Sequence, residues 1–298
     1  MTRWRGYPSH RGMVLVIVLW IITLLAVMAG SFAYSMRVET RLATSAVERA
    51  QARALIEAGV AYALAWRLDS QAQQQWPANG DLHEWAFGGG RIRIHVEDAA
   101  GRISLNNADP RLLRQTLLGI GMAEADVDPA VAAIEDWRDP DDQTRPGGAE
   151  SAEYGALGRP GPRNAPFESV DELQQVLGFN REIAQRLAEV ATVETRISGI
   201  NPALASFAVL RVVTGLDESA IADYISARAQ AAREGLPPPA PPSSENPAFF
   251  SGGQSGIYHI AVAAETGDGT TVSAEVVVSS RNTPQGQAVR WLSWRFDR

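Results

Sequence analysis

The stretch MVLVIVLWIITLLAVMAGSFA, residues 13–33, decides the fold of this chain. Its 21 residues carry no charge, and only Thr23, Gly30 and Ser31 interrupt the apolar side chains. A helix rises about 1.5 Å per residue, so the stretch reaches roughly 30 Å, the thickness of a bilayer's hydrocarbon core. The sequence therefore predicts a transmembrane helix over 13–34.

The charges before this stretch predict its orientation. Arg3, Arg5 and Arg11 precede it and no acidic residue does. Because positive flanks stay on the cytoplasmic side, we expect a single-pass inner-membrane protein with a cytoplasmic N-terminus and a periplasmic bulk. A secretory signal peptide would have a shorter apolar core, followed by a small-residue cleavage site. Here the small residue, Gly12, stands before the core.

Arg11-Gly12-Met13 followed by an apolar run resembles the leader of type IV pilins and type II secretion pseudopilins. The resemblance implies that residues 1–12 are a prepilin-type leader, that prepilin peptidase cuts between Gly12 and Met13, and that the new N-terminus is methylated. An uncut single-pass anchor is the alternative. Most such subunits carry Glu at the fifth mature position, whereas this chain has Ile17. The K-type minor pseudopilin characteristically lacks that Glu.

Ile17 is therefore a candidate assembly residue. In these filaments the Glu is thought to pair with the N-terminal amine of the neighbouring subunit, and an unpaired carboxylate in hydrocarbon is costly. A tip subunit has no neighbour ahead of it and needs no such carboxylate. Ile17 suits that place, and it suits a plain anchor equally.

Composition limits the function classes. The chain has 298 residues, 45% of them hydrophobic, which allows about two domains with a real core. It has no Cys, so disulfides and thiol chemistry are excluded. A net charge of −7 argues against a dominant nucleic-acid surface. No Ser-His-Asp set or phosphate-binding glycine loop is found, and we expect no enzyme.

The segment 35–106 has the pattern of a pilin-like helix and first strands. The helix is expected over Met13–Leu68, and residues 91–97 alternate polar and apolar side chains within a strand over 85–97. A turn at 98–101 and a second strand at 102–106 complete an expected hairpin. The helix is expected to face the soluble domain with Val47, Ala50, Ala54, Ala58, Ala61, Ala65 and Leu68.

The segment 256–298 returns to strands, expected over 256–264, 270–280 and 288–296, so that it completes the sheet. His95 and His259 lie in these strands without companions at ligand spacing, and we interpret both as ordinary sheet residues. The predicted fold is α+β: an N-terminal helix packed on a small antiparallel sheet, with a large helical insertion.

The insertion, 107–235, contains three glycine turns between helix patterns, at 118–121, 177–179 and 214–216. One such helix pattern covers Val170–Leu177. These units resemble helix-hairpin-helix elements, which often bind DNA phosphates, so a membrane-anchored, competence-like DNA-binding protein is the alternative function. Acids outnumber Arg around the turns, which favours a packing scaffold. A proline-rich linker is expected over 236–255.

Acidic residues crowd the segment 124–153, where ten Asp and Glu face two Arg. Crowded carboxylates repel each other unless a cation lies among them, and calcium accepts six to eight oxygens in flexible geometry. With Asp139 as position 1, Asp141, Gln143, Arg145 (backbone carbonyl) and Glu150 fall at positions 3, 5, 7 and 12 of an EF-hand loop. Thr144 replaces the glycine at position 6, so we expect a calcium loop of its own type. A solvated acidic loop is the alternative.

Four motifs, in order, carry a closer resemblance: 101–108 (GRISLNNA), 136–141 (DWRDPD), 148–150 (GAE) and 170–173 (VDEL). They resemble the motif series of the type II secretion minor pseudopilin K family. The resemblance implies a tip subunit of the pseudopilus that initiates or caps assembly for protein export across the outer membrane. It implies partners: minor pseudopilins I and J, the major pseudopilin, prepilin peptidase and the inner-membrane assembly platform. Its candidate calcium ligands are Asp136, Asp139, Asp141, Asp142 and Glu150.

Overall fold

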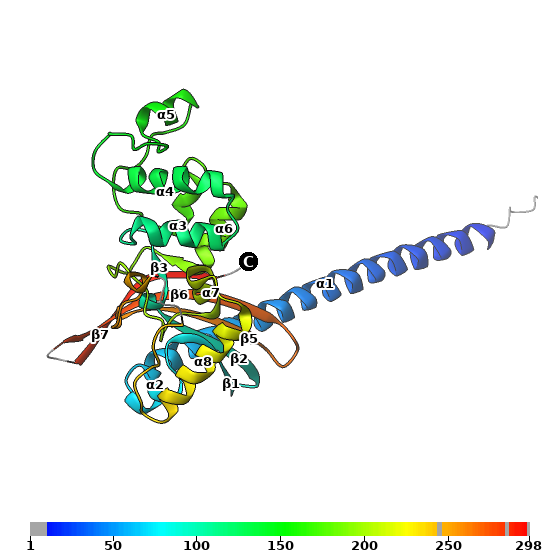
Figure 1. Ribbon diagram of the computed structural model, residues 1–298. Helices are drawn as coiled ribbons and strands as arrows, with labels where there is room; N and C mark the ends of the chain where they lie inside the picture. Colours follow the sequence, from blue (N-terminus) through cyan, green and yellow to red (C-terminus); the bar gives the residue numbers. More distant parts are fainter. Residues whose placement is uncertain (1–10, 243–245, 284–285, 297–298) are drawn as a thin grey trace, which may run out of the picture.

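The computed structural model describes residues 11–242, 246–283 and 286–296. Helix α1 (Arg11–Trp66) is 56 residues long, and its first half projects alone from the rest of the molecule (Figure 1). The apolar side chains there are exposed, and the helix is long and apolar enough to cross a membrane. The expected helix is confirmed, with each end two residues earlier than predicted. Residues 1–10 of the expected leader lie outside the described residues.

The second half of α1 lies on a five-stranded antiparallel sheet of order β1-β2-β5-β6-β7. In β2, Ile92, Ile94 and Val96 point into the core, as the alternation predicted. The predicted α+β class and the three C-terminal strands are confirmed. The strands are β1 (Asn79–Phe87), β2 (Gly90–Asp98), β5 (Ile257–Glu265), β6 (Thr271–Thr283) and β7 (Gly286–Phe296).

The face of α1 that meets the sheet differs from the predicted one. Val47 and Leu68 are exposed, and the buried face carries Leu55, Ile56 and Val60 together with Ala52, Ala63 and Trp66. Alanine contributes little apolar area, so the larger side chains decide the rotation of the helix. The close approach requires Gly59, because a Cβ there would lie 2.7 Å from Cγ1 of Val262.

The first hairpin also differs from the prediction. β1 and β2 form it, with the turn at Gly88 and Gly89, both at positive φ, inside the stretch expected as one strand. The expected second strand at 102–106 is reduced to β3 (Ile103–Ser104), which pairs in parallel with β4 (Ala191–Thr192) away from the main sheet. The short 3-10 helix η1 (Ala99–Gly101) turns the chain out of the sheet, so β3 cannot pair with β2.

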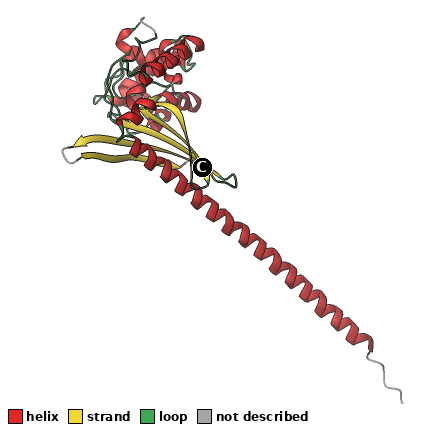
Figure 2. Ribbon diagram, turned by 90° about the horizontal axis from the view of Figure 1, so that it is seen from below, coloured by secondary structure: helices red, strands yellow, loops and turns green. Residues whose placement is uncertain are grey.

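A separate helical core begins at β3, with Ile103 and Leu105 buried in it. It stands at the end of the molecule far from the free half of α1 (Figures 1 and 2). Its last helix also contacts the short helix α2 (Ser70–Gln75), which follows α1. The helices are α3 (Pro110–Gly119), α4 (Glu124–Arg138), α5 (Ser151–Ala156), α6 (Arg181–Val190), α7 (Phe207–Thr214) and α8 (Glu218–Arg233).

The three predicted glycine turns lie between helices. Gly121, Gly178 and Gly215 have φ of 91°, 87° and 66°, a region that side chains disfavour. The helix expected over Val170–Leu177 is shorter and is a 3-10 helix, η2 (Val170–Gln174), because its capping box starts at Ser169 and the chain turns before Gly178. The proline-rich segment 236–242 is largely exposed, but η3 (Pro247–Phe249) places Phe249 in the helical core.

Candidate metal centre

Two helix ends bring the predicted calcium ligands together. Asp136 lies in the last turn of α4, and Asp139 caps that helix with its N–H donated to the carbonyl of Glu135. Glu150 is the N-cap of α5, where its own N–H donates to the carboxylate of Glu153 at 2.8 Å. The loop 139–150 therefore starts and ends at the same acidic cluster.

One carboxylate oxygen from each of Asp136, Asp139 and Glu150 lies within 4.8 Å of the other two. Asp136 is fully buried and Glu150 is 1% exposed. Neither carboxylate oxygen of Glu150 has a hydrogen-bond partner, and neither has Oδ1 of Asp139. Burying such groups without a partner is costly, which favours a cation at this place.

The electrostatics of Glu150 reflect the same crowding. Burial raises the pKa of its carboxyl to about 7, and repulsion from Asp136 and Asp139, then from Asp142 and Asp141, adds to the increase. The other four predicted ligands therefore all act on Glu150. A bound divalent cation would reverse this and favour the ionised carboxylate.

The three clustered acids fit calcium. Calcium binds oxygens at about 2.3–2.6 Å, so oxygens around one ion lie roughly 3–5 Å apart. The 4.8 Å limit of the cluster satisfies this spacing. The set offers oxygens alone, which suits calcium and not zinc. Bound there, calcium would join the end of α4 to the start of α5.

Asp141 and Asp142 stand apart from the buried trio. Both are exposed. Asp141 accepts a hydrogen bond from the backbone N–H of Gln143 at 2.9 Å, and Asp142 accepts one from that of Ser151 at 3.3 Å. Hydrogen bonding from Ser151 lowers the pKa of Asp142. These two acids are therefore not part of the buried cluster of three.

Arg145 enters the site in a way that the sequence did not predict. Its carbonyl, expected as a ligand, accepts the N–H of Gly148 at 2.8 Å. Its guanidinium instead donates to Oδ1 of Asp136 at 2.7 Å and also to Asp139. A loop arginine six residues after Asp139 gives no sequence signal that its side chain folds back.

Residues beside the ligands hold the loop in place. Arg138 donates to the carbonyls of Leu105 and Ala108, and it is partly buried. Trp137 stacks on Phe167 at 6.0 Å and lies 6.0 Å from the ring of Tyr154. The motif residues around the acids thus anchor the site in the helical core.

The predicted processing and assembly residues lie far from this site. The bond between Gly12 and Met13 is in the first turn of α1, and Met13 and Ile17 are exposed. Nothing in the described residues contacts Ile17 closely enough to bury it.

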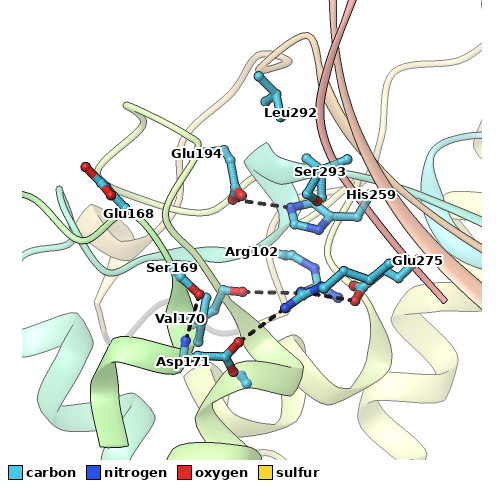
Figure 3. A pocket seen from close by; sticks show the side chains of 14 residues that line it. Arg102, Glu168, Ser169, Val170, Asp171, Glu194, His259, Glu275, Leu292 and Ser293 are labelled. Atoms are coloured by element: carbon cyan, nitrogen blue, oxygen red, sulfur yellow. Dashed lines mark hydrogen bonds and ion pairs between the residues drawn. The ribbon is translucent and has the colours of Figure 1, made fainter. Parts of the chain in front are cut away.

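A second polar site lies between the sheet and the helical core (Figure 3). It is a cavity of about 250 Å³. His259 of β5 is buried in it, with Nε2 at 3.2 Å from Oγ1 of Thr192 and 3.8 Å from Glu194. Burial and the nearby positive charge of Arg102 lower the pKa of His259 well below its usual value. Arg295 of β7 pairs with Asp171 and Glu275, so the site joins the two cores.

Comparisons with known proteins agree with this architecture. Residues 94–196, which include the acidic cluster, match the family described as type II secretion system (T2SS), protein K. Among curated proteins, none matches the sequence significantly.

The fold is similar to that of a chain in the crystal structure of the GspK–GspI–GspJ complex from the type 2 secretion system of enterotoxigenic Escherichia coli. The similarity has a TM-score of 0.52 at 13% identity, and it covers 84% of this chain and 99% of that one. The DNA-binding alternative receives no support from these matches. The family match covers residues 94–196, which carry the acidic site and the first part of the helical core, and over that segment this chain is similar to the type II secretion system protein K family.

Proposed function

We propose that this chain is a minor pseudopilin that occupies the tip of a pseudopilus and initiates or caps its assembly for protein export across the outer membrane. The observation that carries the proposal is the position of the helical core. Its helices α3 to α6 stand beyond the sheet, away from the free half of α1 (Figures 1 and 2). A subunit added at that end of the molecule would contact the helical core and not another α1 helix.

The apolar half of α1 supports the membrane and filament part of the proposal. Its side chains, Ile17 included, have no cover within the chain. Such a surface needs lipid before assembly and neighbouring helices after it. The helix spans the inner membrane with the N-terminus in the cytoplasm, where prepilin peptidase cuts after Gly12 and the new terminus is methylated.

The partners in this proposal are other pilin-like chains. Minor pseudopilins of the I and J types pack along α1, with the major pseudopilin below and the assembly platform in the inner membrane. The complex in which the structurally similar chain was crystallised contains GspI and GspJ and so supports the I and J types as partners. The role is assembly and not catalysis.

Calcium has a structural role in the proposal. Asp136, Asp139 and Glu150 hold the ion, and Asp141 and Asp142 lie near enough to contribute charge. The ion supplies positive charge that cancels the repulsion among the carboxylates. Chelation should therefore lower the melting temperature of the full-length protein in detergent, and added calcium should restore it. An unchanged melting temperature would refute the calcium site.

The glycine turns favour a scaffold over DNA binding. Arg186 donates to the carbonyl of Ile120 at the first turn. At Gly119, a Cβ would lie 2.5 Å from the carbonyl oxygen of Val212 on α7. The first turn therefore packs inward against the neighbouring helices. A gel shift with duplex DNA at physiological salt should show no complex.

Site-specific crosslinking tests the assembly. The chain has no Cys, so a single introduced Cys reacts at one place. Leu42→Cys, on exposed α1, should crosslink to pilin-like chains in cells that carry the secretion system. Leu157→Cys, exposed after α5 in the helical core, is the matched control and should give no such adduct. Absence of adducts from Leu42→Cys would refute the filament role.

Processing is tested separately. Gly12→Ala should leave the precursor uncut in cells with prepilin peptidase, seen as a slower band on a gel. Normal processing of this variant would contradict the predicted cleavage after Gly12, whereas a natural chain that is never cut would favour the uncut anchor.

A further inference from the structure

The guanidinium of Arg145 lies among the carboxylates proposed to bind calcium. It donates to Oδ1 of Asp136 at 2.7 Å and to Oδ2 of Asp139, and its Nε lies 3.5 Å from Glu135. The backbone N–H groups of Arg145 and Ala149 donate to the other oxygen of Asp136 at 3.2 and 2.9 Å. Asp136 is thus fully saturated by donors, although it is buried.

Glu150 is the acid of the three to which Arg145 does not donate a hydrogen bond. Both of its oxygens are buried without a partner, yet one lies within 4.8 Å of oxygens of Asp136 and Asp139. One guanidinium therefore pairs with two carboxylates but leaves Oδ1 of Asp139 and both oxygens of Glu150 without a partner, which indicates a site built for a cation with more charge and more ligands.

We infer that Arg145 is an internal cation: it holds Asp136 and Asp139 in place without metal, and it must leave them when calcium binds. This inference rests on the proposed calcium site. The guanidinium holds one oxygen of Asp136 and one of Asp139, so it lies beside the position that calcium would take among the three carboxylates, and two cations at contact distance repel each other. The displaced Arg145 side chain can move toward solvent or Glu135, because it is 38% exposed and already lies beside Glu135.

Two consequences follow from the competition. The loop keeps its shape at low calcium, since a charge-assisted pair replaces the ion. The apparent calcium affinity is lower than that of the same oxygens without Arg145, because only the fraction of molecules with the guanidinium displaced can bind.

The test is calorimetric titration of the full-length protein in detergent with calcium, together with melting temperatures in chelator, for the natural chain and Arg145→Gln. The substitution keeps length and removes charge. We expect Arg145→Gln to bind calcium about tenfold or more tightly and to melt at a lower temperature without metal. Its calcium-induced increase in melting temperature should be larger than that of the natural chain.

Arg114→Gln is the matched control. Arg114 lies in the same core, is 40% exposed, and also pairs with two acids, Glu124 and Asp128, but not with the cluster. It corrects for the general effect of losing one positive charge. Tightening confined to Arg145→Gln supports the inference.

Weaker or equal calcium binding by Arg145→Gln, compared with Arg114→Gln, would overturn the role of Arg145 and leave the calcium site standing. If no variant binds calcium, the calcium site and the inference both fail.

Discussion

The side-chain amide of Asn106 forms a two-way pair with the backbone of Phe167: Nδ2 donates to its carbonyl at 3.0 Å, and Oδ1 accepts its N–H at 2.7 Å. Nδ2 also donates to the carbonyl of Val193 at 3.1 Å. Phe167 in turn stacks on Trp137, the neighbour of Asp136. One amide thereby links the start of the helical core, the segment after α5, and the acidic site.

Asn106→Ala should lower the free energy of unfolding by about 2–4 kcal/mol, because it removes three hydrogen bonds and leaves backbone groups without partners. Urea unfolding of the full-length protein in detergent measures this. Gln143→Ala is the control: that side chain is exposed in the acidic loop, and its loss should cost less than about 0.5 kcal/mol. Equal effects of the two substitutions would contradict the linking role.

Gly59→Leu should destabilise the packing of α1 on the sheet. A Cβ at this position would lie 2.7 Å from Val262 and 2.8 Å from Ile92, so a larger side chain forces the helix away. Overpacking of this kind costs about 1–3 kcal/mol. Thermal unfolding should show a lower transition temperature for Gly59→Leu. Ala61→Leu, on the exposed face of the same helix, should leave the transition unchanged. A harmless Gly59→Leu would mean that the helix packs more loosely than described.

Glu150 should give the calcium-free protein a pH-dependent stability. The folded carboxyl has a pKa of about 7, raised from 4.5, so the folded state holds the proton more tightly than the unfolded state. Its contribution to stability is therefore full below about pH 4.5 and is lost as pH rises through 7. Calcium binding, which needs the ionised form, should strengthen over the same range.

The contribution of Glu150 is obtained as the difference in melting temperature between the natural chain and Glu150→Gln in chelator. The natural chain should lose stability relative to the variant between pH 5 and pH 8. In saturating calcium the sign should reverse, because the variant loses a ligand. A difference that does not change with pH would exclude the raised pKa.

His259 should make stability depend on pH in the direction opposite to that of Glu150. Burial lowers its pKa well below 6.5, so the unfolded chain binds a proton that the folded chain excludes. Stability from this group is present above about pH 6.5 and is lost as pH falls, by up to about 1.4 kcal/mol per pH unit.

His259→Gln should remove this acid sensitivity while keeping a polar partner for Thr192. Unfolding of both chains between pH 7.5 and 5 measures the difference. His95→Gln is the control, because His95 is exposed on β2. A natural chain no more acid-sensitive than His259→Gln would show that His259 is not buried in the neutral form.

The sequence by itself determined the features that depend on near neighbours in the chain. The uncharged stretch 13–33 predicts a spanning helix, residues 91–97 predict a half-buried strand, and Gly121, Gly178 and Gly215 mark turns. Each follows from period, length or backbone freedom, which are local properties. The density of acids over 136–150 likewise predicts a cation site, and this stays a prediction.

Only the tertiary structure decided the features that depend on distant contacts. The rotation of α1 is set by how Leu55, Ile56 and Gly59 fit the sheet, and not by the alanine spacing. The short strand β3 lies outside the main sheet because it pairs with β4, which follows some ninety residues later in the chain. The side chain of Arg145 turns into the acidic cluster, which no spacing rule predicts, because Asp136 and Asp139 become its neighbours only when the loop after α4 folds back on the end of that helix.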